Sequence, residues 1–419
     1  MALKVNSEIG LLRRVLIHRP GLEIDRMVPT MMEHLLFDDI LDGEEARQEH
    51  DIFCEVLEAM GVETVDAQLL LADVLERAEP REDLFAGLVA SGRVAERALD
   101  RLRELEGVEL AEALIAGVLG ERTSHGNLFE LLPVPNYFFQ RDPQIVVGDR
   151  VVVSSMATEA RERESLLSKI VFRYHEALSG YRRQVEIHSP PHAAPDIGPA
   201  YPFPTLEGGD ILVAAPEILL VGISERTNRR GVEVLAETLR REDTSFRHLL
   251  AIELPSRRAY MHLDTVFTIV DHHACLAYPA VIGADGPEAA RVYSVNLFSD
   301  ELTFTLQPSL LRALADRGLE LDMIPCGGND LIDQEREQWT DGANAFAVAP
   351  GVIFFYQRNR KTAEELERRG WRVLTHRQAL ESSDLRTGGP TAVVFSGHEL
   401  SRARGGPRCM TMPLEREDL

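Results

Sequence analysis

Several features that define a function class are scarce in this sequence. Four cysteines are spread over 419 residues without a Cys-x-x-Cys pair, which excludes a disulfide framework and a zinc knuckle. No stretch approaches the roughly 18 apolar residues that span a bilayer, and the first residues, MALKVNSEIGLLRRVLI, lack the apolar segment of a signal peptide. Lys and Arg number 45 against 68 Asp and Glu, and the net charge of -23 disfavours binding to nucleic acid or anionic lipid. We therefore expect a cytoplasmic protein with reduced thiols and neither a nucleic-acid nor a membrane partner.

The sequence does contain enough apolar residues for a large core. Hydrophobic residues make up 44% of the chain and charged residues 27%, as in ordinary globular proteins. The length alone fits two or three domains or one elaborated α/β unit, and we interpret 1–419 as one α/β domain with an all-helical insert over 66–120. A strand is predicted at 14–18. Spacings of three and four between apolar residues predict a helix over 44–60, before the insert, and helices within it over 68–78, 81–90, 94–105 and 109–119.

A unit of similar pattern recurs three times. It consists of a β-rich run, a short polar segment and an amphipathic helix, and it begins at IVVGDRVVVSS, at APEILLVGISE and at APGVIFFYQRN. The polar segments 154–158, 224–228 and 357–359 should then occupy equivalent places. If the units surround a common axis, these loops converge, and loops at strand ends are where binding and catalytic residues concentrate.

Four polar motifs lie in or beside strand-like runs: NYFFQRDP at 136–143, LEGGD at 206–210, MHLDTVF at 261–267 and RARGGPRCM at 402–410. In LEGGD, two glycines between carboxylates predict a tight bend that aims Glu207 and Asp210. In MHLDTVF, His262 and Asp264 are two residues apart in a β-rich run, so we expect them on one face of a strand. An acidic β-turn and the polar face of an edge strand would give the same patterns, so each motif by itself leaves a structural role open.

Cys409 has the setting of a reactive thiol. It follows three arginines and two glycines in RARGGPRC, and guanidinium groups favour the thiolate while glycines permit close approach of a ligand. The other cysteines, Cys54, Cys275 and Cys326, are expected to be small buried apolar residues. A histidine pair precedes Cys275, but no catalytic-zinc spacing such as HExxH occurs, so we expect no metal.

Together the motifs resemble those of the arginine deiminases, a family of guanidine-modifying enzymes. NYFFQRDP, LEGGD, GISERT, MHLDTVFT, REQWTDGANAFAVAPG and ELSRARGGPRCMTMPLERED occur in the family's order, and SEIGLLRRVLIHRPG and LLFDDI extend the resemblance towards the N-terminus. The helical insert is also a feature of that family. The resemblance implies a pseudo-fivefold α/β propeller of ββαβ-type units around a central pocket, which agrees with the repeated unit, and makes 1–419 a catalytic domain.

The resemblance also implies a reaction, the hydrolysis of L-arginine to L-citrulline and ammonia through a covalent S-alkylthiouronium intermediate, without metal or organic cofactor. Asp142, Glu207 and Asp264 match the carboxylates that hold the guanidinium, which is always charged and therefore needs ionised partners. Cys409 matches the nucleophile that attacks the guanidinium carbon. His262 matches the acid that protonates the departing ammonia and then activates water.

The α-carboxylate of such a substrate needs cations at the other end of the pocket. The resemblance assigns this contact to Arg226 and Arg404, and to Arg161, with Arg163 close enough in sequence to compete for the role. Asn136 is a further polar contact. The alternative for Arg161 and Arg163 is a solvated helix face on which neighbouring glutamates pair with them.

Two other functions use the same residues. An amidinotransferase, or a hydrolase of methylated arginines, would form the same covalent adduct. An arginine-binding sensor would keep the pocket without turnover, although binding alone requires neither Cys409 nor His262. Because the family forms dimers or larger assemblies, we also expect a homo-oligomer.

Overall fold

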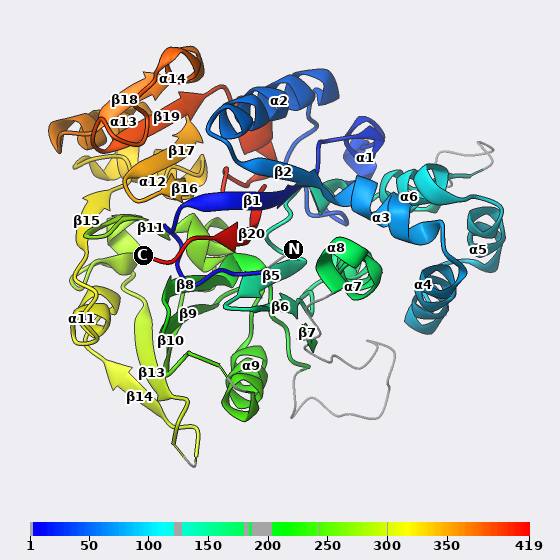
Figure 1. Ribbon diagram of the computed structural model, residues 1–419, viewed down its shortest axis with the longest axis horizontal. Coiled ribbons are helices and arrows are strands. Elements are labelled where there is room, and N and C mark those ends of the chain that lie inside the picture. Colours follow the sequence, from blue (N-terminus) through cyan, green and yellow to red (C-terminus); the bar gives the residue numbers. More distant parts are fainter. Residues whose placement is uncertain (1–2, 121–127, 180–183, 187–202, 243, 300) are drawn as a thin grey trace.

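A computed structural model describes residues 3–120, 128–179, 184–186, 203–242, 244–299 and 301–419. The fold is mixed α/β, with short sheets towards the middle and helices around them (Figure 1). The expected α/β class is therefore confirmed. Among these residues, none of the helices combines the length and the apolar character that crossing a membrane requires.

Five sheets within the described residues share one local topology. The first strand pairs antiparallel with the second, and the second pairs parallel with a third strand that follows an intervening helix. The sheets contain β5 (Gln144–Val147), β6 (Arg150–Val153) and β7 (Gln184–Glu186); β8 (Ile211–Ala215), β9 (Ile218–Ile223), β10 (His248–Glu253), β13 (Arg291–Asn296) and β14 (Phe304–Gln307); β11 (Phe267–Asp271), β12 (Ala274–Ala277) and β15 (Asp322–Pro325); β16 (Phe346–Ala349), β17 (Val352–Tyr356), β18 (Arg372–Thr375) and β19 (Thr391–Phe395); and β20 (Met412–Arg416), β1 (Leu12–Ile17) and β2 (Glu63–Asp66).

The three units recognised in the sequence are present, and two more follow the same pattern. The fifth sheet joins the two ends of the chain, since β20 near the C-terminus pairs with β1 near the N-terminus, and Leu16 lies opposite Met412. In the third sheet, β13 and β14 interrupt the chain between β12 and β15 and join the second sheet instead. Two short strands, β3 (Val118–Leu119) and β4 (Phe129–Leu131), pair antiparallel outside the five sheets.

The helices follow local signals. Asp42 accepts hydrogen bonds from Glu44 N and Glu45 N at the start of α2, and Asn228 accepts one from Gly231 N at the start of α9. The α-helices are α1 (Leu22–Asp25), α2 (Gly43–Ala59), α3 (Ala67–Leu75), α4 (Ala78–Ser91), α5 (Glu96–Arg103), α6 (Gly107–Ala116), α7 (Glu162–Tyr174), α8 (Glu176–Ser179), α9 (Arg229–Arg241), α10 (Pro279–Ile282), α11 (Leu310–Ala315), α12 (Leu331–Trp339), α13 (Arg360–Arg368) and α14 (His376–Glu381). The 3-10 turns are η1 (Pro29–Met31), η2 (Pro135–Phe138), η3 (Glu159–Arg161), η4 (Gly208–Asp210), η5 (Arg258–Tyr260), η6 (Leu263–Thr265) and η7 (Leu400–Ala403).

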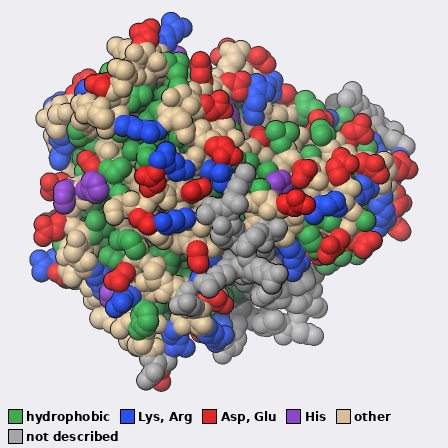
Figure 2. Space-filling model, in the orientation of Figure 1, with side chains coloured by type: hydrophobic (Ala, Val, Ile, Leu, Met, Phe, Trp, Pro, Cys, Tyr) green, Lys and Arg blue, Asp and Glu red, His purple; other side chains and the backbone are tan. Residues whose placement is uncertain are grey.

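The predicted helical segment is observed as α3 to α6. The observed bounds differ from the predicted ones by one to three residues. Pro80, expected in a turn, lies in the first turn of α4, where the missing N–H of proline has no helical partner to lose. Acidic side chains are numerous on the outer face of this segment, which projects to the right in Figure 2.

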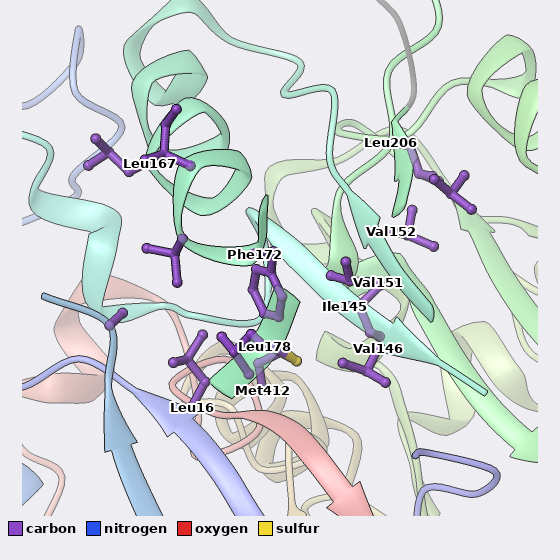
Figure 3. Close-up of a cluster of buried hydrophobic side chains, with 14 of the residues drawn as sticks. Leu16, Ile145, Val146, Val151, Val152, Leu167, Phe172, Leu178, Leu206 and Met412 are labelled. Atoms are coloured by element: carbon purple, nitrogen blue, oxygen red, sulfur yellow. The ribbon is translucent and has the colours of Figure 1, made fainter. Parts of the chain in front are cut away.

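The helical segment shares its core with the sheets. One cluster of buried side chains includes Leu71 of α3, Leu110 of α6 and Val151 of β6. Figure 3 shows the part of this cluster around Val151, in which Phe172 of α7 lies near Leu178 and Met412. Burying a large apolar side chain stabilises the fold by about 1.5–3 kcal/mol, so this shared core holds the helical segment against the sheets.

Candidate active site

Backbone hydrogen bonds bring three of the four motifs together. Arg141 N donates to the carbonyl of Cys409 over 3.0 Å, so the QRDP segment lies beside the C-terminal motif. Gly208 N donates to the carbonyl of Asp142 over 3.0 Å, which places LEGGD on the same segment. The side chains of Asp142 and Cys409 thus start from adjacent backbones, although 267 residues separate them in the sequence.

The predicted bend in LEGGD is confirmed and brings the fourth motif close. Glu207 is followed by the 3-10 turn η4. A Cβ added at Gly209 would lie 2.7 Å from the His262 ring and 2.9 Å from Oδ1 of Asp142. Only a glycine therefore allows the imidazole and the carboxylate to approach the bend this closely.

His262 and Asp264 do not project from one face of a strand, which corrects the sequence interpretation. His262 immediately precedes the 3-10 turn η6 and Asp264 lies within it, whereas β11 begins only at Phe267. Asp210 holds this turn, since its Oδ1 accepts a hydrogen bond from Leu263 N over 2.8 Å. Thr265 donates from its hydroxyl to the carbonyl of His262 over 2.6 Å. These tertiary and local hydrogen bonds outweigh the β propensity of the run.

A buried cluster forms around the imidazole. His262 Nε2 lies 2.8 Å from Oε2 of Glu207, and its Nδ1 lies 3.7 Å from Oδ1 of Asp142. Arg161 enters the same cluster, with Nη1 2.7 Å from Oδ2 of Asp142 and 3.7 Å from Oε2 of Glu207. All four side chains are buried, so their charges interact with little screening by water.

The carboxylates keep the imidazole charged. Burial opposes the charge of His262, but Asp142 and the hydrogen bond to Glu207 outweigh it and raise the pKa of the imidazole to about 9. Burial likewise opposes ionisation of Glu207, but Arg226 and His262 lower the pKa of its carboxyl to about 2. At neutral pH the pair is therefore an imidazolium donating to a carboxylate.

Cys409 lies in a second contact group with Asp264. Its Sγ is 3.7 Å from Oδ2 of Asp264, and the same oxygen accepts a 2.7 Å bond from Nη1 of Arg408. Burial and the negative charge of Asp264 raise the pKa of the Cys409 thiol well above its usual value. The expectation that neighbouring arginines favour the thiolate is wrong, because Arg408 is paired with Asp264 and Glu8.

Asn344, which was not among the residues predicted from the sequence, contacts the sulfur directly. Its Nδ2 lies 3.2 Å from Sγ of Cys409 and donates to the carbonyl of Asp264 over 3.1 Å. Its Oδ1 accepts from the backbone N–H groups of Arg408 and Cys409 over 3.1 and 3.2 Å. Its only sequence signal is its place in TDGANAF, within the motif REQWTDGANAFAVAPG that resembles the family.

The residues expected to contact a substrate carboxylate differ in whether their side chains already have partners. Arg161 is bound to Asp142 and Glu164, and the Nδ2 of Asn136 is bound to the carbonyl of Leu35 over 2.8 Å. Arg226 is buried with Nη1 3.9 Å from Oε1 of Glu207, and this Nη1 has no hydrogen-bond partner among the described residues.

Arg404 is turned towards a tryptophan. It adopts the left-handed conformation with φ 67°, its guanidinium carbon lies 3.5 Å from the ring centre of Trp339, and Nη1 donates to the Trp339 carbonyl. Its Nε is buried without a hydrogen-bond partner in the described part of the chain. Arg163, the competitor of Arg161, is not bound to the carboxylate cluster and donates instead to the carbonyl of Leu132.

One set of residues has metal-ligand geometry. Asp142, Glu207 and His262 offer ligand atoms that all lie within 4.8 Å of one another. The Arg161 guanidinium already contacts Asp142 there, and His262 is protonated, so a cation would have to displace both charges. The histidine pair next to Cys275 is exposed in the turn between β11 and β12. That no metal binds remains a prediction.

Comparison with known proteins gives one family over nearly the full length. The arginine deiminase family model matches residues 33–416. An arginine deiminase from Listeria monocytogenes serotype 4a is 36% identical over 436 aligned residues, covering 100% of this chain and 98% of that protein. One from Streptococcus pyogenes serotype M49 is 36% identical over 438 aligned residues, covering 99% of this chain and 98% of that protein.

Solved structures with a similar fold share less sequence. An amidinotransferase from Microseira wollei, in the saxitoxin biosynthetic pathway, aligns with a TM-score of 0.54 at 14% identity, covering 100% of this chain and 98% of that one. A dimethylarginine dimethylaminohydrolase in an adduct with S-methyl-L-thiocitrulline aligns with a TM-score of 0.51 at 14% identity, covering 96% and 99%. These two likenesses show the fold alone. Because the family model and the sequence relatives extend over nearly the whole chain, the protein belongs to the arginine deiminase family.

Proposed function

We propose that this protein hydrolyses L-arginine to L-citrulline and ammonia. The observation that carries the proposal is a set of buried polar atoms without hydrogen-bond partners in the described residues. Oδ1 of Asp142 and Oδ1 of Asp264 are such acceptors, one beside His262 and the other in the contact group of Cys409. Orphaned buried acceptors are costly, at about 1–3 kcal/mol each, and a guanidinium between them would satisfy both.

The other end of the substrate finds donors of the same kind. Nη1 of Arg226 and Nε of Arg404 are buried without acceptors among the described residues, and an α-carboxylate would supply them. Arg161 and Asn136 border the Asp142 side of the site, where Nη2 of Arg161 lies 3.5 Å from the carbonyl of Asn136. We propose that Arg161, Arg226 and Arg404 bind the α-carboxylate and that Asn136 is a further polar contact.

The first half of the reaction uses Cys409 and His262. A bound guanidinium places a positive charge beside the sulfur, which favours loss of the thiol proton to water. The thiolate then adds to the guanidinium carbon. The imidazolium of His262 gives its proton to one amino group, and the carbon–nitrogen bond breaks to release ammonia and leave a positively charged S-alkylthiouronium with neutral His262. Asp142, Glu207 and Asp264 hold the planar cation in place for attack.

The second half restores the enzyme. Neutral His262 takes a proton from water, and the hydroxide adds to the thiouronium carbon. The intermediate then expels the sulfur as thiolate. Its hydroxyl proton passes to this thiolate, which yields the urea group of citrulline and regenerates the thiol. In this scheme Glu207 stabilises the imidazolium in both halves, because it accepts the 2.8 Å bond from Nε2. The five side chains proposed to be catalytic are all buried.

The test is the variant Cys409→Ala, with Cys54→Ala as the matched control. We expect Cys409→Ala to lose citrulline and ammonia formation while its unfolding temperature stays close to that of the wild type, and Cys54→Ala to keep full activity. Mass spectrometry of the quenched wild-type reaction should find the adduct on the peptide that contains Cys409. Undiminished citrulline formation by Cys409→Ala would refute the mechanism.

Added reactants separate the alternatives. Glycine or ornithine supplied with arginine would give a new guanidino product if the protein were an amidinotransferase, and methylated arginines would be cleaved if it were their hydrolase. A sensor would bind arginine in a calorimeter without releasing ammonia. From arginine we expect citrulline and ammonia, with no new guanidino product when glycine or ornithine is present and no methylamine released from methylated arginines.

We also propose the finer architecture and state of assembly. The shared topology of the five sheets supports a pseudo-fivefold propeller of ββαβ-type units spanning 1–419, with 66–120 as a helical insert. The four free cysteines, one of them the proposed nucleophile, suit a reducing cytoplasm. We expect a homo-oligomer, which light scattering of the purified protein tests directly; a monomeric mass would contradict it.

A further inference from the structure

A cavity of about 510 Å³ lies between the helical segment and the α/β part of the chain. Residues of α4 and just after it, the stretch 129–133, η3 and the start of α7 line the cavity, together with His34 and Leu35. None of Asp142, Arg161, Glu207 and His262 is among the lining residues, so the cavity is distinct from the carboxylate cluster described above. Leu88, Val94, Phe129, Leu131 and Leu166 provide an apolar lining. A cavity of this size and character accommodates a small organic molecule.

Most charges around the cavity are neutralised within the protein. Arg93 forms ion pairs with Glu159 and, over 2.9 Å, with Glu162. Glu130 lies 3.0 Å from Nε of Arg97 and 3.2 Å from Nη1 of Arg101. A ligand entering the cavity therefore meets few uncompensated charges.

Arg163 is the exception on the cavity wall. Its Nη2 donates to the carbonyl of Leu132, and its Nε is buried without a hydrogen-bond partner among the residues that the structure describes. No carboxylate of those residues lies within ion-pairing distance. Burial lowers the pKa of this guanidinium to about 10, and the nearby charge of Glu164 only partly opposes that effect. An arginine in this state lacks an anionic partner.

We propose that this cavity binds a small molecule that carries one carboxylate on an apolar body. The carboxylate would accept N–H groups of the Arg163 guanidinium, a side chain that lines the cavity and has no carboxylate partner among the described residues. The hydrocarbon part would lie against Leu88, Phe129 and Leu166. The site differs from the proposed arginine site in chemistry, since it takes an anion with an apolar tail and the other takes a guanidinium.

The test uses octanoate as the probe and calorimetry with the full-length protein at moderate salt. We expect one octanoate per chain, with octanol binding at least about tenfold more weakly because it cannot form a charge-assisted bond. Arg163→Gln should weaken octanoate binding by a similar factor. Arg173→Gln, which changes an exposed arginine on the same helix, should bind as the wild type does.

A second variant tests the cavity independently of the charge. Ala90 lines the cavity from α4 and is exposed, so Ala90→Phe fills space without disturbing a packed core, and it should abolish octanoate binding while the protein stays folded. Cys409→Ala should bind octanoate like the wild type, which separates this proposal from the fate of the proposed reaction. Absence of octanoate binding to the wild type, or equal binding by Arg163→Gln, would overturn it.

Discussion

The lack of a side chain at Gly209 allows the His262 imidazole to lie close to the bend. The substitution Gly209→Ala tests how strongly catalysis depends on that position. The backbone conformation here is not left-handed, so alanine introduces no φ strain, and its effect comes from the added methyl group alone. That methyl would lie 2.7 Å from Cγ and Nδ1 of His262, whereas ordinary contacts begin at 3.4 Å. The ring must therefore shift by about 0.7 Å, which is the difference between the two distances.

Such a shift is large for this site. His262 is 2% exposed and has little room to move. Its 2.8 Å hydrogen bond to Glu207 would stretch or bend to the limit of hydrogen bonding. Misplacement of a catalytic group by about 1 Å costs on the order of 100-fold in rate. Overpacking of a buried site also costs about 1–3 kcal/mol of stability.

We expect the kcat for citrulline formation by Gly209→Ala to fall about 100-fold, with an unfolding temperature only a few degrees below the wild type. The control is Gly318→Ala, where φ is 86° and no heavy atom lies within 4 Å of the added methyl. It should lose stability through backbone strain but keep its kcat. If Gly209→Ala retained full kcat, the 2.8 Å geometry at His262 would not be what catalysis requires.

Three further predictions concern charge, the sulfur contact and a buried carboxylate. The pKa of His262 is raised from 6.5 to about 9 in the folded protein, so its contribution to stability is complete below pH 6.5 and is lost as the pH rises through about 9. Because catalysis needs the imidazolium, kcat/KM should also fall above about pH 9 in a pH–rate profile. Asn344→Ala should lower the citrulline kcat about 100-fold, because it removes the donor 3.2 Å from the sulfur; a normal rate would show that this contact is structural only. Glu49→Ala should cost about 3 kcal/mol or more in denaturant unfolding, because Glu49 accepts hydrogen bonds from three backbone N–H groups of residues 398–400, and an unchanged midpoint would contradict this.

Much of the fold could be predicted because its signals are local. A strand, a polar loop and an amphipathic helix follow one another within about 30 residues in the units around β6, β9 and β17, and periodicity suffices to recognise each. The same holds for α3 to α6. The motifs that supplied Cys409, Glu207 and Asp142 were likewise visible, because glycines and charged residues are conspicuous in apolar runs.

Only the tertiary structure decided the remaining features, because each depends on contacts between distant residues. β20 pairs with β1 across almost the whole chain, and no local pattern indicates that register. The 3-10 turn after His262 exists because Asp210, 53 residues away, accepts a bond from it. The neutral state of the Cys409 thiol also follows from spatial partners, since burial beside Asp264 outweighs the arginines that adjoin it in sequence. Residue types and their order determined which chemistry is available. Long-range packing determined which buried atoms lack hydrogen-bond partners and are therefore free to take part in that chemistry.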